Sequence, residues 1–286
     1  IRDVGGVHGI DLQMQYLVDE GQVEGPSVFA AGRLIAMTGG HACMLGFEVD
    51  GADAARKAAR QNLKAGARLI KLIATGGVLT QGVRPGAQQL SEAEMRAAVE
   101  EAHKVGKTVA AHAQGAEGID AALRAGVNTI EHGFWLSDYA LECLKEPGRA
   151  LVPTLAALRC MERLGDAMPP YIQAKLKAVA TPHYDSIRRA HAAGCCIAAG
   201  TDAGTPANPH GNMGVELAGL AELGLSASEC WRAATINGAR ALSLDDRGQL
   251  APGKRADIIA IQNHDFDVIN EGFRPHFVMR GGERLR

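Results

Sequence analysis

The 286-residue sequence has little of what marks several classes of protein. Aromatic residues make up 4% of the chain, which leaves little material for surfaces that stack on nucleic-acid bases. The formal net charge is −2, which gives no electrostatic reason to bind nucleic acid or an anionic membrane. No apolar run approaches the roughly 18 residues of a membrane span. We therefore expect neither a nucleic-acid partner nor a membrane partner.

Paired cysteines and a secretion signal are also missing. None of the cysteines forms a CxxC pair, and a chain of this size needs no disulfides to fold. Reduced thiols and a cytoplasmic location are the expectation that follows. The chain opens with IRDVGG and has no initiating Met, so we expect it to be part of a longer protein. N-terminal targeting therefore stays open.

Predicted strands and helices alternate along most of the chain. Short apolar segments predict strands at 1–4, 27–31, 68–73, 107–111, 127–130, 150–153 and 195–199. Helical spacing of apolar residues predicts helices at 8–20, 52–65, 91–105, 118–125, 137–145, 155–193, 215–223 and 227–237. The long helical region should break at Pro169-Pro170, with Pro182 as a second break point. Ser91 followed by Glu94 is a capping-box pattern and predicts a helix start.

This alternation predicts an α/β fold of the (β/α)8 TIM-barrel type. Seven strand–helix units are one short of a closed barrel, and a barrel lacking a strand would leave two open edges. We therefore predict that residues 1–247 hold strands 2–8 of such a barrel. Short β-segments after Gly248 predict that residues 248–286 form part of a small β-sandwich domain. An open doubly wound sheet is the alternative, although IRDVGGVHG matches its GxGxxG phosphate motif poorly.

The segment 107–133 reads as strand, helix, strand, and each strand leads into a histidine. His112 follows the first strand and His132 follows the second. Parallel strands joined by a helix end at the same edge of a sheet, so both imidazoles are expected there. A buried histidine bonded to the backbone is the alternative for either residue alone. Two histidines on consecutive strand ends favour a metal site.

Lys71, Asp202 and His41 are the other candidates for chemistry. Lys71 lies within the apolar segment RLIKLI, where a charged ammonium is costly to bury. It either reaches solvent or an ion-pair partner, or it is carboxylated by CO₂ and so able to bridge two cations. Asp202 in GTDAG either caps the following segment or serves as a metal ligand and proton shuttle. His41 lies in a glycine-rich loop, where a solvent-exposed histidine is the alternative.

The motifs together resemble the amidohydrolase superfamily, in order and over nearly the whole chain. They are most similar to its branch of metal-dependent Xaa-Pro dipeptidases and related carboxypeptidases, which also contains imidazolonepropionase-like proteins. The tail GQLAPGKRADIIAI resembles the segment that leads such a chain back into its β-sandwich. The motifs are TGGH (38–41), IKLIATGGV (70–78), AAHAQG (110–115), IEHG (130–133), VPTL (152–155) and GTDAG (200–204).

The resemblance implies a role for each candidate. It makes Lys71 a carboxylated lysine that bridges two divalent metals, usually zinc. His112 and His132 would bind the β metal. Asp202 would bind the α metal and act as general acid and base, and His41 would polarise the scissile carbonyl. Two departures are visible: the first-strand HxH pair of the family has no counterpart in this chain, and Ala42 follows TGGH where many relatives have Gly.

The predicted activity is hydrolysis of the amide bond of a dipeptide or N-acyl amino acid by a metal-bridging hydroxide. Xaa-Pro and Xaa-Arg or Xaa-Lys dipeptides are the expected substrates, and the family implies a homo-oligomer. Arg33, Arg84 and His210 lie in loops and are weaker candidates for holding the substrate carboxylate, since loop arginines are usually solvated. A cyclic amide hydrolase resembling imidazolonepropionase is an alternative. An inactive fragment or binding scaffold is another, if the HxH pair is truly absent.

Overall fold

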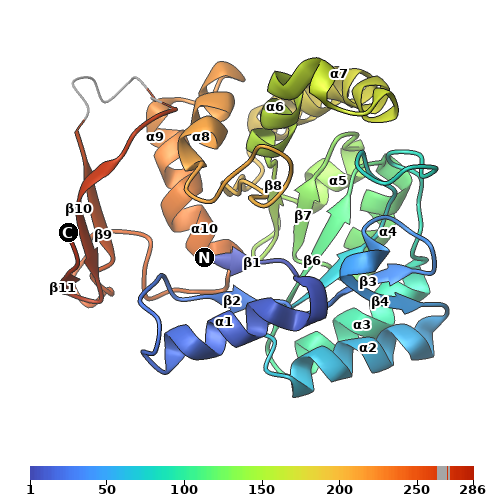
Figure 1. The fold of residues 1–286 in the computed structure, drawn as a ribbon, viewed down its shortest axis with the longest axis horizontal. Coiled ribbons are helices and arrows are strands. Elements are labelled where there is room, and N and C mark those ends of the chain that lie inside the picture. The colour runs from blue at the N-terminus through green and yellow to red at the C-terminus, as the bar shows by residue number, and fades with distance from the viewer. Residues whose placement is uncertain (263–268, 270) are drawn as a thin grey trace. The chain divides into compact units, whose positions relative to one another are not determined.

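The structure is a computed structural model that describes residues 1–262, 269 and 271–286. These residues form two compact units, Ile1–Cys143 and Leu144–Arg286. Figure 1 shows the elements of both units in chain order, from blue to red. The predicted boundary between residues 247 and 248 separates a barrel from a β-sandwich domain. It does not correspond to the division after Cys143, and it stays a prediction.

A parallel sheet forms the centre of the first unit. Its strands β3 to β7 are neighbours in the order β4–β3–β5–β6–β7. The register places Lys71 opposite Ala110 and Ala113 opposite His132. Because the strands are parallel, their carboxyl ends lie at one edge. The bounds are Leu34–Met37 (β3), Gly46–Val49 (β4), Leu69–Ile73 (β5), Thr108–Ala113 (β6) and Thr129–His132 (β7), and β1 (Arg2–Asp3) pairs separately with β2 (Phe29–Ala30).

Helices follow most strands of the first unit, as the sequence predicts. The helix α3 begins at the predicted capping box, where the Ser91 hydroxyl accepts from the Glu94 amide. The helix α4 ends at Gly126, which has a φ of 98° that favours glycine. The α-helices are Ile10–Asp19 (α1), Ala52–Lys64 (α2), Glu92–Lys104 (α3), Ala116–Ala125 (α4) and Asp138–Cys143 (α5), with 3₁₀ turns at Val7–Gly9 and Cys43–Leu45.

The second unit is mainly helical and ends in a small antiparallel sheet. Its sheet has the strand order β11–β10–β9 and is drawn in dark red and brown in Figure 1. The strands are Ala150–Val152 (β8), Ile258–Ile261 (β9), Pro275–Arg280 (β10) and Glu283–Arg284 (β11). The helices are Leu155–Leu164 (α6), Pro170–Ala192 (α7), Met213–Glu222 (α8), Ala227–Arg232 (α9) and Gly238–Ala241 (α10), with a 3₁₀ turn at Gly165–Ala167 and a π-helical turn at Ala233–Asn237.

The predicted α/β class, with parallel strands and a late β-segment, is confirmed, but three local predictions were wrong. The glycine-rich region after residue 31 is not all loop, because it contains β3 and β4, which are only four residues each. The segment 195–199 is not a full strand. It pairs with β8 through a single parallel bridge, between Ile197 and Leu151. The helix α7 continues through Pro182, so the predicted break there was wrong. The predicted break at Pro169-Pro170 is present, because α7 begins at Pro170.

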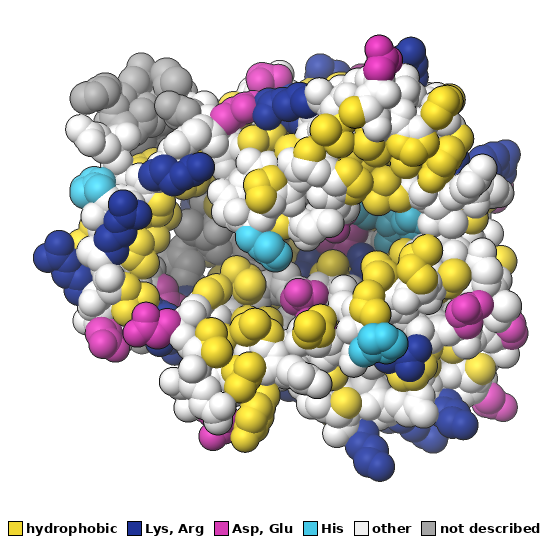
Figure 2. All heavy atoms as spheres, in the orientation of Figure 1, with side chains coloured by type: hydrophobic (Ala, Val, Ile, Leu, Met, Phe, Trp, Pro, Cys, Tyr) yellow, Lys and Arg dark blue, Asp and Glu magenta, His cyan; other side chains and the backbone are white. Residues whose placement is uncertain are grey.

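The surface gives little sign of charge segregation on the face drawn in Figure 2. Acidic and basic side chains of the described residues are scattered and intermixed there. Among the described residues, no helix combines the length and apolarity that crossing a membrane requires.

The packing of α2 against α3 is reinforced by one acidic side chain. The Glu101 carboxylate accepts hydrogen bonds from Arg60 at 2.9 Å, Lys104 at 2.8 Å and Arg56 at 2.7 Å. These bonds lower the pKa of Glu101 far below its ordinary range. The carboxylate is therefore charged in the folded protein at every pH at which the protein is expected to be folded.

We predict that Glu101→Gln lowers the free energy of unfolding at pH 7, because three cations lose their shared anion. A carboxyl whose folded pKa is depressed adds stability above its unfolded pKa of about 4.3 and loses it as the pH falls further. The difference between wild type and variant should therefore shrink as the pH drops below about 5. Urea unfolding across this range measures it, with Glu100→Gln as control, because Glu100 contacts only Arg56 among the ion pairs described. A difference that is independent of pH would contradict the assignment.

Candidate active site

Three imidazoles and a lysine gather at the carboxyl edge of the sheet in the first unit. Lys71, in β5, is 4% exposed, and His112, in β6, is 5% exposed. The ring centroids of His112 and His132 lie 4.5 Å apart, and those of His41 and His112 also lie 4.5 Å apart. The structure therefore brings together four of the residues singled out in the sequence.

The position of His41 is set by the loop that follows β5. Its Nδ1 lies 2.8 Å from the Thr80 hydroxyl, and its backbone N–H donates to Gln89 Oε1 at 2.9 Å. Gly77 packs against the imidazole, so that a Cβ there would lie 2.8 Å from His41 Cδ2. His41 is consequently buried at 8% exposure, and the solvent-exposed alternative for this histidine does not hold.

The loop itself, residues 74–90, is closed by backbone bonds. Gly76 N–H donates to Ala87 O at 2.8 Å, and Gln89 N–H donates to Ala74 O at 2.8 Å. The backbone of Gly86 meets Gly115, just after β6, so closely that neither position has room for a larger residue. The loop is thereby fixed to the ends of both β5 and β6, and it carries the partners of His41 with it.

The electrostatics of the cluster favour a neutral imidazole at His112. Burial is the main cause that lowers the pKa of His112 well below its ordinary value, and His41, His132 and Lys71 lower it further. The Nε2 atom of His112 lies 3.4 Å from Gly76 O. A neutral imidazole offers a lone pair, which is what a metal ion requires of a histidine ligand.

These side chains fit a divalent metal in kind. Within the described residues, however, His, Cys, Asp and Glu side chains form no group of three that could hold an ion by themselves. His112 and His132 amount to two nitrogen ligands. A third has to be of another type, and Lys71 would supply an oxygen ligand if it were carboxylated. Burial disfavours the charged ammonium of Lys71, and the neutral amine is the form that reacts with CO₂.

Asp202 belongs to the second unit and lies in a loop beyond the bridge at Ile197. Its backbone has a φ of 53°, in the left-handed region that non-glycine residues rarely adopt. His132, with a φ of 73°, and Thr154, with a φ of 56°, share this property, and each stands at the end of a strand. Strained residues at strand ends are typical of functional sites because the surrounding fold must hold them.

Glu216 is a residue that the sequence reasoning missed. It is fully buried in α8, where Oε2 accepts from the Ala156 N–H at 2.8 Å, and Oε1 has no hydrogen-bond partner among the described residues. Burial raises the pKa of Glu216 to about 8, and the nearby charge of Asp202 raises it too. The carboxyl is therefore protonated at neutral pH. The signal was present in the apolar segment VELAGL, which holds one acid as RLIKLI holds one lysine.

The weaker candidates for substrate binding are placed less favourably. Arg33 donates to Gly46 O at 2.5 Å and stacks over Phe47 with 4.0 Å between its Cζ and the ring centroid. That guanidinium therefore connects the starts of β3 and β4. Arg84 and His210 are exposed on their loops.

Comparison with known proteins places this geometry in a family. The model of the Amidohydrolase family matches residues 1–285. Ochratoxinase of Aspergillus niger is 29% identical over 312 residues, which cover 97% of this chain and 64% of that protein. The chain thus spans less than two thirds of this curated relative. The crystal structure of A. niger ochratoxinase superimposes with a TM-score of 0.88 at 28% identity, covering all of this chain and 71% of the other.

Two other solved structures are equally similar. One is a Xaa-Pro dipeptidase with methionine bound in its active site, with a TM-score of 0.89 and 32% identity over 100% of this chain and 74% of the other. The second is a prolidase in complex with N-methylphosphonate-L-proline, with a TM-score of 0.85 and 28% identity over 100% of this chain and 74% of the other. These matches confirm the resemblance drawn from the motifs. The chain belongs to the amidohydrolase family.

Proposed function

We propose that the protein is a metal-dependent hydrolase that cleaves the amide bond of a dipeptide or an N-acyl amino acid. The observation that carries the proposal is the cluster of buried Lys71 and His112 with half-buried His132, beside His41, on neighbouring parallel strands. Such an edge is where barrel enzymes hold their catalytic groups. The relatives named above support a small, peptide-like substrate.

The proposal assigns a separate role to each residue of the site. Carboxylated Lys71, His112 and His132 would hold divalent metal, with zinc as the expected ion. Bound metal supplies Lewis-acid polarisation of a carbonyl and a water of lowered pKa. Asp202 is assigned as a further ligand and as general acid and base from its GTDAG motif. It would take the proton of the attacking water and deliver it to the leaving amine.

His41 is suited to donate a hydrogen bond to the substrate carbonyl. The Thr80 hydroxyl oxygen already accepts from the Ala42 N–H at 3.3 Å. We propose that the same hydroxyl donates its hydrogen to His41 Nδ1, 2.8 Å away. The ring proton then resides on Nε2. A neutral donor in a buried setting can stabilise the negative charge that develops on a carbonyl oxygen.

A cytoplasmic location is proposed as well. All six cysteines are free thiols, and Cys143, Cys160 and Cys230 are buried. Unpaired thiols are the rule where glutathione keeps the compartment reducing.

Substitution of Lys71 tests the metal-binding part. We expect Lys71→Met, which keeps the length of the side chain without its amine, to lower kcat/KM by more than about 100-fold and to lose bound metal. Lys71→Glu should retain more metal than Lys71→Met, because it restores a carboxylate. Elemental analysis and steady-state kinetics measure both, with exposed Lys57→Met as control. Full metal content and full rate in Lys71→Met would contradict the role.

The substrate class is tested with a panel. We expect turnover of Xaa-Pro, Xaa-Arg or Xaa-Lys dipeptides or of N-acyl amino acids, followed by release of the free amine. Cyclic amides such as imidazolones form the contrasting set, because the same metal chemistry would serve them. Hydrolysis of ring substrates alone would overturn the dipeptidase proposal in favour of the cyclic amidase.

The role of His41 is tested through its neighbour. We expect Gly77→Ala to lower kcat about 10-fold or more, because the new methyl group must displace the His41 ring and so weaken its hydrogen bond to the carbonyl. Gly25→Ala is the matched control, since a Cβ there would meet Val18 at an ordinary 3.6 Å. Thermal melts accompany the kinetics. A folded Gly77→Ala protein with wild-type kcat would show that the position of His41 is unimportant.

A further inference from the structure

The turn that carries Asp202 is held by one buried side chain. Asn208 is 2% exposed, and its side-chain amide donates to Thr201 O at 2.7 Å and to Asp202 O at 3.0 Å. The same nitrogen lies 3.1 Å from the Thr205 hydroxyl. The backbone of Asn208 closes the loop as well, since its carbonyl accepts from the Gly204 N–H at 2.9 Å.

The two carbonyls held by Asn208 are those on either side of the Asp202 Cα. One belongs to the peptide plane before Asp202 and the other to the plane after it, so their relative orientation is defined by φ and ψ of Asp202. Fixing both oxygens on one nitrogen therefore fixes the backbone of Asp202. This backbone has a φ of 53°, which is unfavourable for a residue with a Cβ and must be stabilised by its surroundings.

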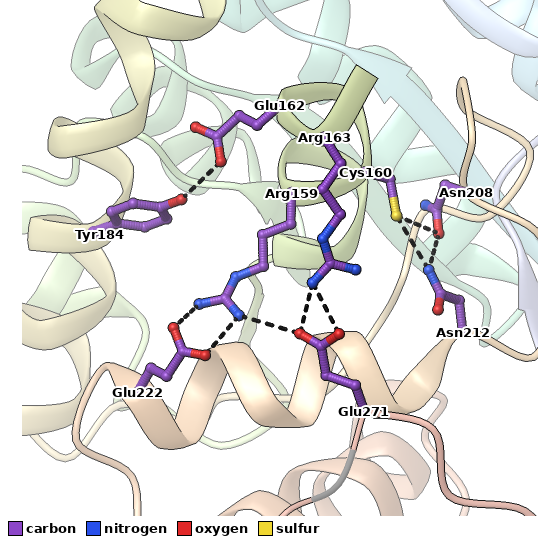
Figure 3. A network of polar contacts seen from close by, with 9 residues as sticks. All are labelled: Arg159, Cys160, Glu162, Arg163, Tyr184, Asn208, Asn212, Glu222 and Glu271. Carbon is purple, nitrogen blue, oxygen red and sulfur yellow. Dashed lines mark hydrogen bonds and ion pairs between the residues drawn. The ribbon is translucent and has the colours of Figure 1, made fainter. Parts of the chain in front are cut away.

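The Asn208 amide is itself oriented by its neighbours. Its Oδ1 accepts from Asn212 Nδ2 at 3.0 Å and faces Cys160 Sγ at 4.0 Å, as Figure 3 shows. The Asn212 amide also reaches Cys160 Sγ at 3.2 Å. With donors on the Oδ1 side and oxygen acceptors on the Nδ2 side, only one orientation of the amide satisfies every group. Helix α6 and the start of α8 therefore determine how Asn208 holds the turn.

We propose that Asn208 is a positioning residue that sets the orientation of Asp202 for proton transfer. This inference rests on the proposed function, since it assumes that Asp202 is the general acid and base. The requirement for Asn is chemical. Two N–H hydrogens on one nitrogen can serve both flanking carbonyls, whereas an aspartate in the same place would present an oxygen to them. A serine or alanine would lose at least one of the two bonds.

The test compares Asn208→Ala and Asn208→Asp with the wild-type protein. Both variants should lower kcat about 10- to 100-fold with KM changed much less, because the substrate still binds while Asp202 is misdirected. Hydrogen exchange of peptides covering residues 200–209 should become faster in both. Asn208→Asp keeps the shape of the side chain, so its effect separates loss of the two donors from loss of packing.

A matched control is another asparagine whose side chain holds a backbone carbonyl near this turn. The Asn237 side chain donates to Ile197 O at 2.8 Å, a backbone carbonyl before the Asp202 turn. Asn237→Ala removes a similar bond and lowers stability without touching the turn. We expect it to keep kcat within about 2-fold and to leave exchange of residues 200–209 unchanged.

The outcomes separate this inference from the proposed function. Wild-type kcat and wild-type exchange in both Asn208 variants would overturn the inference, and so would an equal loss of kcat in Asn237→Ala. Faster exchange in the Asn208 variants with unchanged kcat would show that the turn is held but that Asp202 needs no such hold, which also overturns it. If the wild-type protein hydrolyses no amide, the proposed function fails and the inference fails with it. Faster exchange in the Asn208 variants would then still show that Asn208 holds the turn.

Discussion

The structure of the candidate site depends on the burial of nitrogen bases at the ends of parallel strands. A lysine and three histidines lie close together, and among the groups that shift the pKa of His112 are three other bases. Keeping a buried imidazole charged beside other bases would be costly, so the cluster favours the neutral form of His112. Neutral imidazoles and a carboxylated lysine would be suitable ligands for a divalent cation. The proposed metal site would therefore account for the burial of these bases.

Backbone strain is the second constraint that the two units share. His132, Thr154 and Asp202 all adopt left-handed backbone conformations where strands or loops end. Such conformations direct a side chain differently from the alternation of a strand, and they persist only where other groups hold them. Loop 74–90 holds His41 in the first unit, and Asn208 holds Asp202 in the second. The two candidate side chains thus depend on neighbours to which we assign no chemical step.

The ends of the strands could be predicted from the sequence because an apolar run that finishes in a polar residue is a local pattern. Recognising it requires no knowledge of tertiary contacts. His112 and His132 stood out for this reason, Lys71 stood out as a lone charge inside an apolar strand, and the motif order suggested the family. The short strands β3 and β4 escaped notice, since four residues in a glycine-rich region carry too little periodicity. Asn208 and Gly77 were also missed, because their importance lies in contacts with Asp202 and His41 that no local pattern encodes. Glu216 could have been found as a lone acid in an apolar helix.

Anomalous X-ray diffraction at the zinc absorption edge, from crystals of the zinc-loaded protein, tests the central claim most directly. The account predicts an anomalous peak about 2.0–2.1 Å from ring nitrogens of both His112 and His132. It also predicts carboxylate density on Lys71 Nζ, with an oxygen about 2.0–2.2 Å from the metal. An unmodified Lys71 ammonium with no anomalous peak near either histidine would contradict it.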